Sequence, residues 1–166
     1  MPTIAQVALA DLDHELANTR LMLERYPDGK NDFTPHDKSW PMIRLAAHVA
    51  TLPDLGCMAL SRSEIDFANP LPARPTPPTD RASLLAAFER DSSAFKGLLA
   101  EATDEAMMET WTMRAGAHVI LAMPRVGVLR SMIINHLVHH RAQLTIYYRL
   151  CGVPVPGLYG PSADDA

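Results

Sequence analysis

Hydrophobic residues recur at helical spacing along most of the chain. In the first segment one stripe has members three or four residues apart, which places them on a single face of an amphipathic helix. This stripe consists of Ile4, Ala8, Leu12, Leu16, Thr19, Leu23 and Tyr26. Pro27, Asp28 and Gly29 follow at once, and because these residues favour turns, the helix is expected to end there.

A second helix is expected to start near Ser39. Serine can cap the free backbone N–H groups of a helix, and Pro41 is tolerated in a first turn. The apolar face predicted for this helix consists of Met42, Leu45, Ala46, Val49 and Leu52. Pro53 lacks an N–H and clashes with the preceding turn, so it is expected to kink or interrupt the helix, whose pattern then resumes towards Ile65.

Five prolines between Asn69 and Pro78 predict an extended connector, because this segment cannot form a helix. A third helix is expected to begin at Thr79 or Asp80. Asp91 interrupts its apolar stripe, which comprises Leu84, Phe88, Phe95, Leu98 and Leu99.

In residues 109–123 the helical spacing gives way to an alternation of apolar and polar residues, on both sides of a turn at residues 114–117. This pattern predicts a short β-hairpin. A last helix is expected from about Arg125 to Leu150. The sequence therefore predicts an all-α fold, a four-helix bundle with a short β-hairpin before the last helix, in which residues 1–166 form a single domain.

The composition restricts the classes of partner. Among the 166 residues the formal net charge is −4 and no block of lysine or arginine occurs, which argues against binding to nucleic acid or to an anionic membrane surface. No apolar stretch of about eighteen residues predicts a membrane span, and the first residues lack a secretion signal. Cys57 and Cys151 are far apart and form no CxxC pair, so no disulfide framework is expected. We therefore expect a cytoplasmic protein with a small-molecule substrate and neither a nucleic-acid nor a membrane partner.

Three histidines lie within residues 136–140 of the predicted last helix. His136 and His140 are one turn apart, so both imidazoles leave the same face and can bind one divalent metal ion. Both interrupt an apolar stripe, where an unsatisfied histidine is costly. That stripe runs through Leu129, Ile133, His136, His140, Leu144 and Tyr147. His139 lies one ridge round the helix and is the less favoured ligand.

A third ligand is needed to hold a metal ion well. His48 is the best candidate, because it interrupts an apolar run on the second helix. His14 lies beside carboxylates off its helix stripe, His36 lies in a polar loop and His118 lies near the hairpin turn, so none of them is a favoured ligand. On spacing alone, core histidines hydrogen-bonded to backbone or carboxylate groups remain an equal alternative to a metal site.

The chain resembles the DinB/YfiT-like superfamily. The resemblance is close from Met123 to Asp165, and it rests on Met123–Arg125, Val128–Arg130, Asn135–His136, His140–Leu144, Tyr147–Leu150, Val153–Pro156 and Tyr159–Asp164. The N-terminal half matches more loosely, through His48 and Thr51–Pro53. Ala142 stands where the family usually has glycine, which should matter little because alanine is the better helix former.

The resemblance implies a four-helix bundle, often with a short hairpin before the last helix, and a homodimer. It also implies a metal held by one histidine from the second helix and two from the last, which in this chain are His48, His136 and His140. Imidazole nitrogens alone do not fix the identity of a divalent ion, although zinc and nickel are favoured.

Three neutral imidazoles leave a divalent ion with its full charge and an open coordination position, which is typical of catalytic sites. A water or a thiol bound there would lose its proton more readily. Characterised relatives include enzymes that activate a low-molecular-weight thiol, so the resemblance predicts a metal-dependent thiol transferase-like enzyme. The alternatives are a metal-dependent hydrolase and a non-catalytic metal- or ligand-binding stress protein.

Four further residues are candidates for supporting roles. Arg125 and Arg141 could each hold a substrate carboxylate, or form a salt bridge that packs the bundle. Tyr147 could place its hydroxyl near the metal or serve as a core aromatic residue. Asp54 could orient a ligand from beside the site or face solvent. No carboxylate has a spacing that demands the role of general base.

Overall fold

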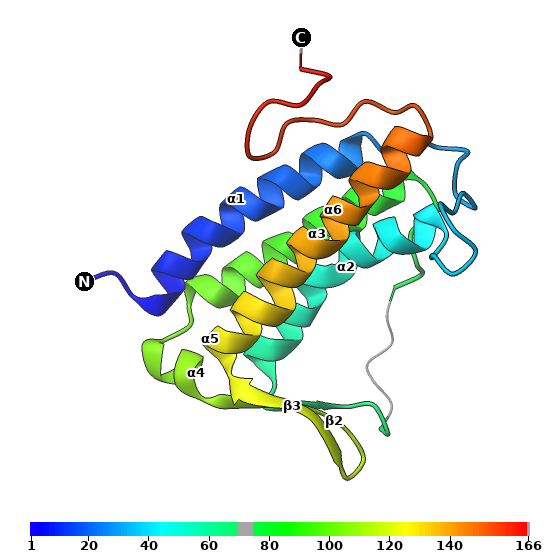
Figure 1. The fold of residues 1–166 in the computed structure, drawn as a ribbon. Coiled ribbons are helices and arrows are strands. Elements are labelled where there is room, and N and C mark those ends of the chain that lie inside the picture. The colour runs from blue at the N-terminus through cyan, green and yellow to red at the C-terminus, as the bar shows by residue number, and fades with distance from the viewer. Residues whose placement is uncertain (70–74, 166) are drawn as a thin grey trace.

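Four long helical segments form a bundle in the computed structural model, which describes residues 1–69 and 75–165 (Figure 1). The segments are α1 (Ile4–Glu24), α2 (Met42–Ser61), α3 (Arg81–Ala100) and a final segment that runs from α5 (Arg125–Val128) through η1 (Leu129–Ile134) to α6 (Asn135–Leu150). The short helix α4 (Asp104–Met108) and a small sheet lie at one end of the bundle (Figure 1). The predicted four-helix bundle with a hairpin before its last helix is confirmed.

Hydrogen bonds from side chains define where two of the helices begin. At α1, Thr3 accepts a bond from the backbone N–H of Gln6, and the Gln6 side chain accepts one from the N–H of Thr3. Asp80 and Ser83 form the same reciprocal arrangement at α3, which confirms that this helix begins beside Asp80. Within the predicted connector before it, residues 75–78 are not helical, and residues 70–74 lie outside the described part of the chain.

Helix α2 differs from its prediction at its start and in its middle. It begins at Met42 rather than near Ser39, because Pro41 has an extended backbone and lies outside the helix. It then continues through Pro53 without interruption. The residues around this proline are largely buried in the bundle, and that burial outweighs a local cost of about 3 kcal/mol.

The sheet has the strand order β1-β2-β3. Strand β1 (Glu64–Asp66) pairs in parallel with β2 (Thr110–Ala115), which pairs antiparallel with β3 (His118–Pro124). The hairpin turn contains Gly116 at φ +59°, a left-handed conformation that glycine adopts without strain. The sequence predicts the hairpin but not β1. Ile65, expected in a helix, lies in β1 and is buried in a small cluster with residues of β2.

The final helical segment contains a π-helical turn that the sequence pattern does not predict. At the end of η1 the backbone N–H of Asn135 bonds to the carbonyl of Arg130, five residues back rather than four. Such a turn inserts about one extra residue and changes the face that each later residue occupies. The buried face of α6 consequently differs from the predicted stripe, and it consists of Leu137, Arg141, Leu144, Tyr147 and Tyr148.

Helix α2 is long and apolar enough to cross a membrane by length and composition, with 20 residues and a mean hydropathy of 1.2. The sequence analysis expects no such segment. Half of the helix is buried inside the bundle, where it packs against α3 and α6. A buried core helix can have the same composition as a membrane-spanning helix. The length and composition of α2 are therefore only weak evidence that it crosses a membrane.

Candidate metal centre

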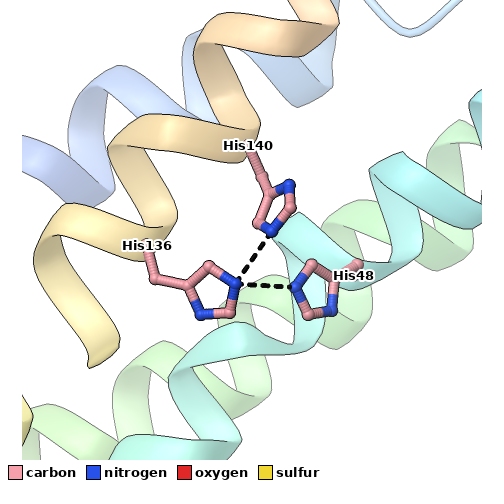
Figure 2. Close-up of side chains that lie close together, drawn as sticks. All are labelled: His48, His136 and His140. Carbon is pink, nitrogen blue, oxygen red and sulfur yellow. Dashed lines mark hydrogen bonds between the residues drawn. The ribbon is translucent and has the colours of Figure 1, made fainter. Parts of the chain in front are cut away.

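Three histidines from two helices point toward one another at the centre of the site (Figure 2). His48 projects from α2, and His136 and His140 project from successive turns of α6. One nitrogen of each ring lies within 4.8 Å of the others, so the group could hold a metal ion. The structure thus brings together the three residues that the sequence analysis selects. That they bind a metal remains a prediction.

The three rings form a triangle with centroids 4.6 to 5.1 Å apart, and dashed lines join His136 to each of the other two (Figure 2). The Nε2 atom of His136 is 3.3 Å from Nε2 of His48 and 2.8 Å from Nε2 of His140. Nitrogen ligands at about 2.0–2.1 Å from a tetrahedral zinc ion lie about 3.3 Å from one another. The first separation equals that value, and the second is 0.5 Å shorter. All three nitrogens lie within 4.8 Å of one another, so the group could hold one divalent ion.

Hydrogen bonds on the far side of two rings fix the positions of their protons. Nδ1 of His136 lies 3.3 Å from the carbonyl oxygen of Met132, and Nδ1 of His140 lies 2.8 Å from Oε1 of Gln143. Both oxygens only accept, so each Nδ1 carries the proton and each Nε2 carries a lone pair. In neutral rings with these tautomers the two Nε2 atoms, 2.8 Å apart, would have no proton between them, and a metal ion bound to both would relieve their repulsion.

Burial favours the neutral, metal-binding form of two of the rings. All three histidines are half-buried. Burial lowers the pKa of His136 and of His140 below the usual value for histidine, and the neighbouring His139 acts in the same direction. Because a protonated imidazole does not bind a metal, this shift prepares both rings for metal binding at neutral pH.

Trp40 covers the histidines. Its ring stacks on that of His140, with centroids 6.0 Å apart, and meets the ring of His48 edge-on at 5.6 Å. Two cavities share Trp40 as a wall: one of about 440 Å³ reaches His48, and one of about 480 Å³ reaches His140. Small molecules can therefore approach the histidine cluster by two routes.

Arg125 and Arg141 pack the bundle and line neither cavity. Arg141 is 1% exposed and donates to the carboxylate of Glu15 on α1 at 2.6 Å. Arg125 is also buried and forms an ion pair with Glu109. Of the two roles that the sequence leaves open for these arginines, the structure shows the packing role. The N–H groups of both side chains donate to acceptors within the bundle.

Tyr147 and Asp54 lie near the cluster in different ways. Tyr147 is a core aromatic residue whose hydroxyl donates to the carbonyl oxygen of Trp40 at 2.9 Å. It therefore fixes the backbone of the residue that covers the histidines. Asp54 is half-buried and lines the cavity that reaches His48.

The other histidines lie outside the cluster. His139 is exposed, and its Nε2 accepts a hydrogen bond from the Gln143 amide at 3.2 Å. Within the described part of the chain, His14, His36 and His118 lie outside the group that could hold a metal.

The sequence analysis does not select three residues of the site: Trp40, Arg44 and Gln143. Arg44 lies one turn before His48, and its guanidinium stands 4.3 Å from the centroid of the Trp40 ring. Gln143 lies three residues after His140 on α6. Arg44 and Gln143 could have been found from the sequence, because each lies one helical turn from a clustered histidine. Trp40 precedes α2 in a non-helical segment and has no periodic signal.

A comparison with known families agrees with this geometry. The model of the DinB superfamily matches residues 11–144, a range that includes all three clustered histidines. The chain belongs to the DinB superfamily. This match confirms the resemblance found in the sequence.

The chain is similar to a protein of known sequence and to a solved structure. The uncharacterized protein YrdA of Bacillus subtilis (strain 168) is 30% identical over 129 residues, which are 77% of this chain and 71% of the relative. A solved structure of a DinB-like protein from Bacillus cereus ATCC 10987 matches with a TM-score of 0.69, covering 92% of this chain and 95% of that one. At 23% identity this second match shows the fold alone. The chemistry has to be argued from the histidine cluster.

Proposed function

We propose that this DinB superfamily member is a metal-dependent transferase that uses a low-molecular-weight thiol to attack an electrophilic small molecule. The observation that carries the proposal is the meeting of three imidazole nitrogens beside two cavities. A reaction between two small molecules needs room for both, whereas a hydrolase that uses water needs room for one substrate. Two cavities that share the Trp40 wall support the two-molecule reaction.

His48, His136 and His140 would hold the metal ion, and imidazole donors favour zinc or nickel. A divalent ion bound by neutral imidazoles keeps its full charge and lowers the pKa of a thiol or a water at its open position.

The residues of the chain orient the ligands and shield the site. Gln143 and the Met132 carbonyl hold the rings of His140 and His136 with Nε2 toward the cluster. Trp40 packs against two of the rings, and the Tyr147 hydroxyl holds its backbone.

The proposed reaction forms one bond and breaks another. The thiol releases its proton to solvent, and its sulfur forms a bond with an electrophilic carbon of the second molecule. The leaving group departs with the electron pair of the broken bond, so the reaction consumes no oxidant or reductant.

Conjugation assays test the proposal. Protein loaded with zinc or nickel is incubated with bacillithiol, mycothiol or glutathione and a panel of electrophiles. We expect a metal-dependent product with at least one thiol, lost in His140→Ala and retained in His118→Ala, whose side chain is exposed on β3. The absence of product with all three thiols and both metals would contradict the proposal.

The same assays separate the alternatives. Turnover of ester or amide substrates without any thiol would indicate a metal-dependent hydrolase. A protein that binds metal, melts at a lower temperature after chelation and turns over no substrate would be a non-catalytic metal- or ligand-binding stress protein. A cytoplasmic location, a homodimer, and the absence of nucleic-acid and membrane partners remain part of the proposal, and sedimentation velocity measures the oligomeric state.

A further inference from the structure

The cavity that reaches His48 is bounded by α2, by residues 75–78 and by α3. Its volume of about 440 Å³ lies within the usual range of small-molecule sites, roughly 300–1,000 Å³. Its wall is partly apolar, from the Trp40 ring and the prolines of residues 75–78. It also contains charged groups, and these decide which kind of molecule the cavity accepts.

The two arginines of this cavity differ in their partners. Arg90 donates two hydrogen bonds to the carboxylate of Asp91, at 2.8 and 3.1 Å. The guanidinium of Arg44 instead lies over the Trp40 ring, and in residues 1–69 and 75–165 no carboxylate forms an ion pair with it. The contact with the indole holds this cation in place, because a ring face attracts positive charge. Arg44 can therefore pair with an anion from outside the protein.

Arg44 also lies close enough to His48 for one small molecule to contact both residues. It precedes His48 by one turn of α2, so the two side chains leave the same face of the helix, with Cβ atoms about 5–6 Å apart. Both residues line the cavity. A small molecule bound there can contact Arg44 at one end while its other end reaches His48.

We propose that Arg44 and Trp40 form a binding subsite for a small monocarboxylate with an apolar body. This rests on the proposed function in one respect, that the molecule bound here is the one transformed at the histidines. A guanidinium binds a carboxylate through two parallel hydrogen bonds, and the indole and the prolines supply apolar contact for the rest of the molecule. Phosphate has no apolar body and gains nothing from the Trp40 ring or the prolines, so the subsite favours the carboxylate.

Binding of phenylacetate tests the subsite independently of activity. The protein has two tryptophans, and Trp111 is fully buried in a separate cluster, so a fluorescence change on binding reports Trp40. We expect phenylacetate to change this fluorescence in both metal-free and metal-loaded protein. Loss of one charged hydrogen-bonding partner should weaken binding about tenfold or more in Arg44→Met. Arg130→Met, which changes an exposed arginine outside the cavity, should bind as the native protein does.

Two ligand controls complete the test. Phenylacetamide, which has the same shape without the charge, should bind weakly and equally to the native protein and to Arg44→Met. Equal phenylacetate affinity in native protein and Arg44→Met would overturn the subsite, and so would inorganic phosphate that competes as strongly as phenylacetate. If phenylacetate binds through Arg44 but no thiol is conjugated, the proposed function fails and the subsite stands. If conjugation occurs but Arg44→Met binds phenylacetate normally, the subsite fails and the function stands.

Discussion

The proton positions on two imidazoles determine what the histidine cluster can bind. Gln143 and the Met132 carbonyl each accept a hydrogen bond from an Nδ1 atom, so the Nε2 lone pairs of His136 and His140 face each other. Neutral nitrogen donors attract a cation without cancelling its charge. The individual residues therefore favour a divalent ion that retains its power to polarise a bound molecule.

Arg141 contributes to stability rather than to chemistry. Because Arg141 is 1% exposed and Glu15 is nearly buried, Arg141→Met leaves the Glu15 carboxylate without its cationic partner. We expect the free energy of unfolding to fall by about 3–5 kcal/mol. Urea denaturation with a chelator present measures this without a contribution from bound metal.

The matched control for Arg141→Met is Arg130→Met. Arg130 pairs with Asp11 at the surface, where both side chains are more than half exposed, so its loss should cost about 0–1 kcal/mol. Equal losses in the two variants would show that the Arg141 ion pair does not stabilise the bundle more than a surface pair.

The thiol of Cys57 should be unreactive at mildly alkaline pH. Burial, reinforced by the charges of Asp54 and Asp91, raises its pKa from 9.0 to about 11. Since the thiolate is the nucleophile, alkylation at pH 8 in a Cys151→Ala background should be about a hundredfold slower in folded than in denatured protein. Iodoacetamide labelling followed by mass spectrometry measures both rates, and equal rates would refute the shift.

The same pKa shift makes a contribution to stability that depends on pH. A folded-state pKa above the unfolded value favours the fold fully below pH 9, and this contribution is lost as pH rises through about 11. In Cys57→Ala that part of the pH dependence should disappear.

The sequence predicts the clustered histidines but not the roles of Arg141 and Trp40, and the difference has a physical reason. His48, His136 and His140 interrupt apolar patterns, where a polar ring needs a partner, and this conflict is visible without a structure. The burial of Arg141 depends on Glu15, which lies 126 residues away in the chain, so local pattern says nothing about it. Trp40 lies in a loop, where periodicity carries no information.

At the scale of elements, the π-helical turn determines how α6 faces the bundle. It ends at Ile134, two residues before His136, and its extra residue rotates the helix so that both histidines lie at the margin of the buried face rather than at its centre. That margin borders the cavity that reaches His140. The sequence predicts one uninterrupted α-helix from Arg125 to Leu150. It does not predict the π-helical turn, because one extra residue leaves no recognisable mark on the hydrophobic pattern. Strand β1, with three residues, is also too short to show a pattern.

The close packing of α2 against α3 can be tested by adding a single methyl group at Gly56. A Cβ atom at Gly56 would lie 2.5 Å from the ring of Phe95, which is 1% exposed on α3. Gly56→Ala should therefore push the two helices apart and lower the free energy of unfolding by about 1–3 kcal/mol. Thermal and urea denaturation measure the change.

Gly97→Ala is the matched control for Gly56→Ala. A Cβ atom at Gly97 meets nothing within 4 Å, so the change should raise stability by up to about 1 kcal/mol, because alanine is the better helix former. If Gly56→Ala were as stable as Gly97→Ala, the close contact between α2 and α3 would be wrong.

At the scale of the whole molecule, the histidine cluster would join two helices that lie far apart in the sequence. His48 of α2 and the two histidines of α6 are separated by the third helix, the short helix and the hairpin. The C-terminal segment adds a second connection, because the Tyr159 hydroxyl donates to Glu15 on α1 at 2.7 Å. A metal ion would therefore stabilise the bundle as a whole, in addition to supplying chemistry.

The metal content of tag-free protein tests the central claim most directly. After reconstitution with zinc or nickel and removal of free ions, elemental analysis should find about one ion per chain in native protein and in His118→Ala. His48→Ala and His140→Ala should each lose most of it, because either change leaves two ligands. Native protein without bound metal, or full retention in both variants, would contradict a metal centre built from these three histidines.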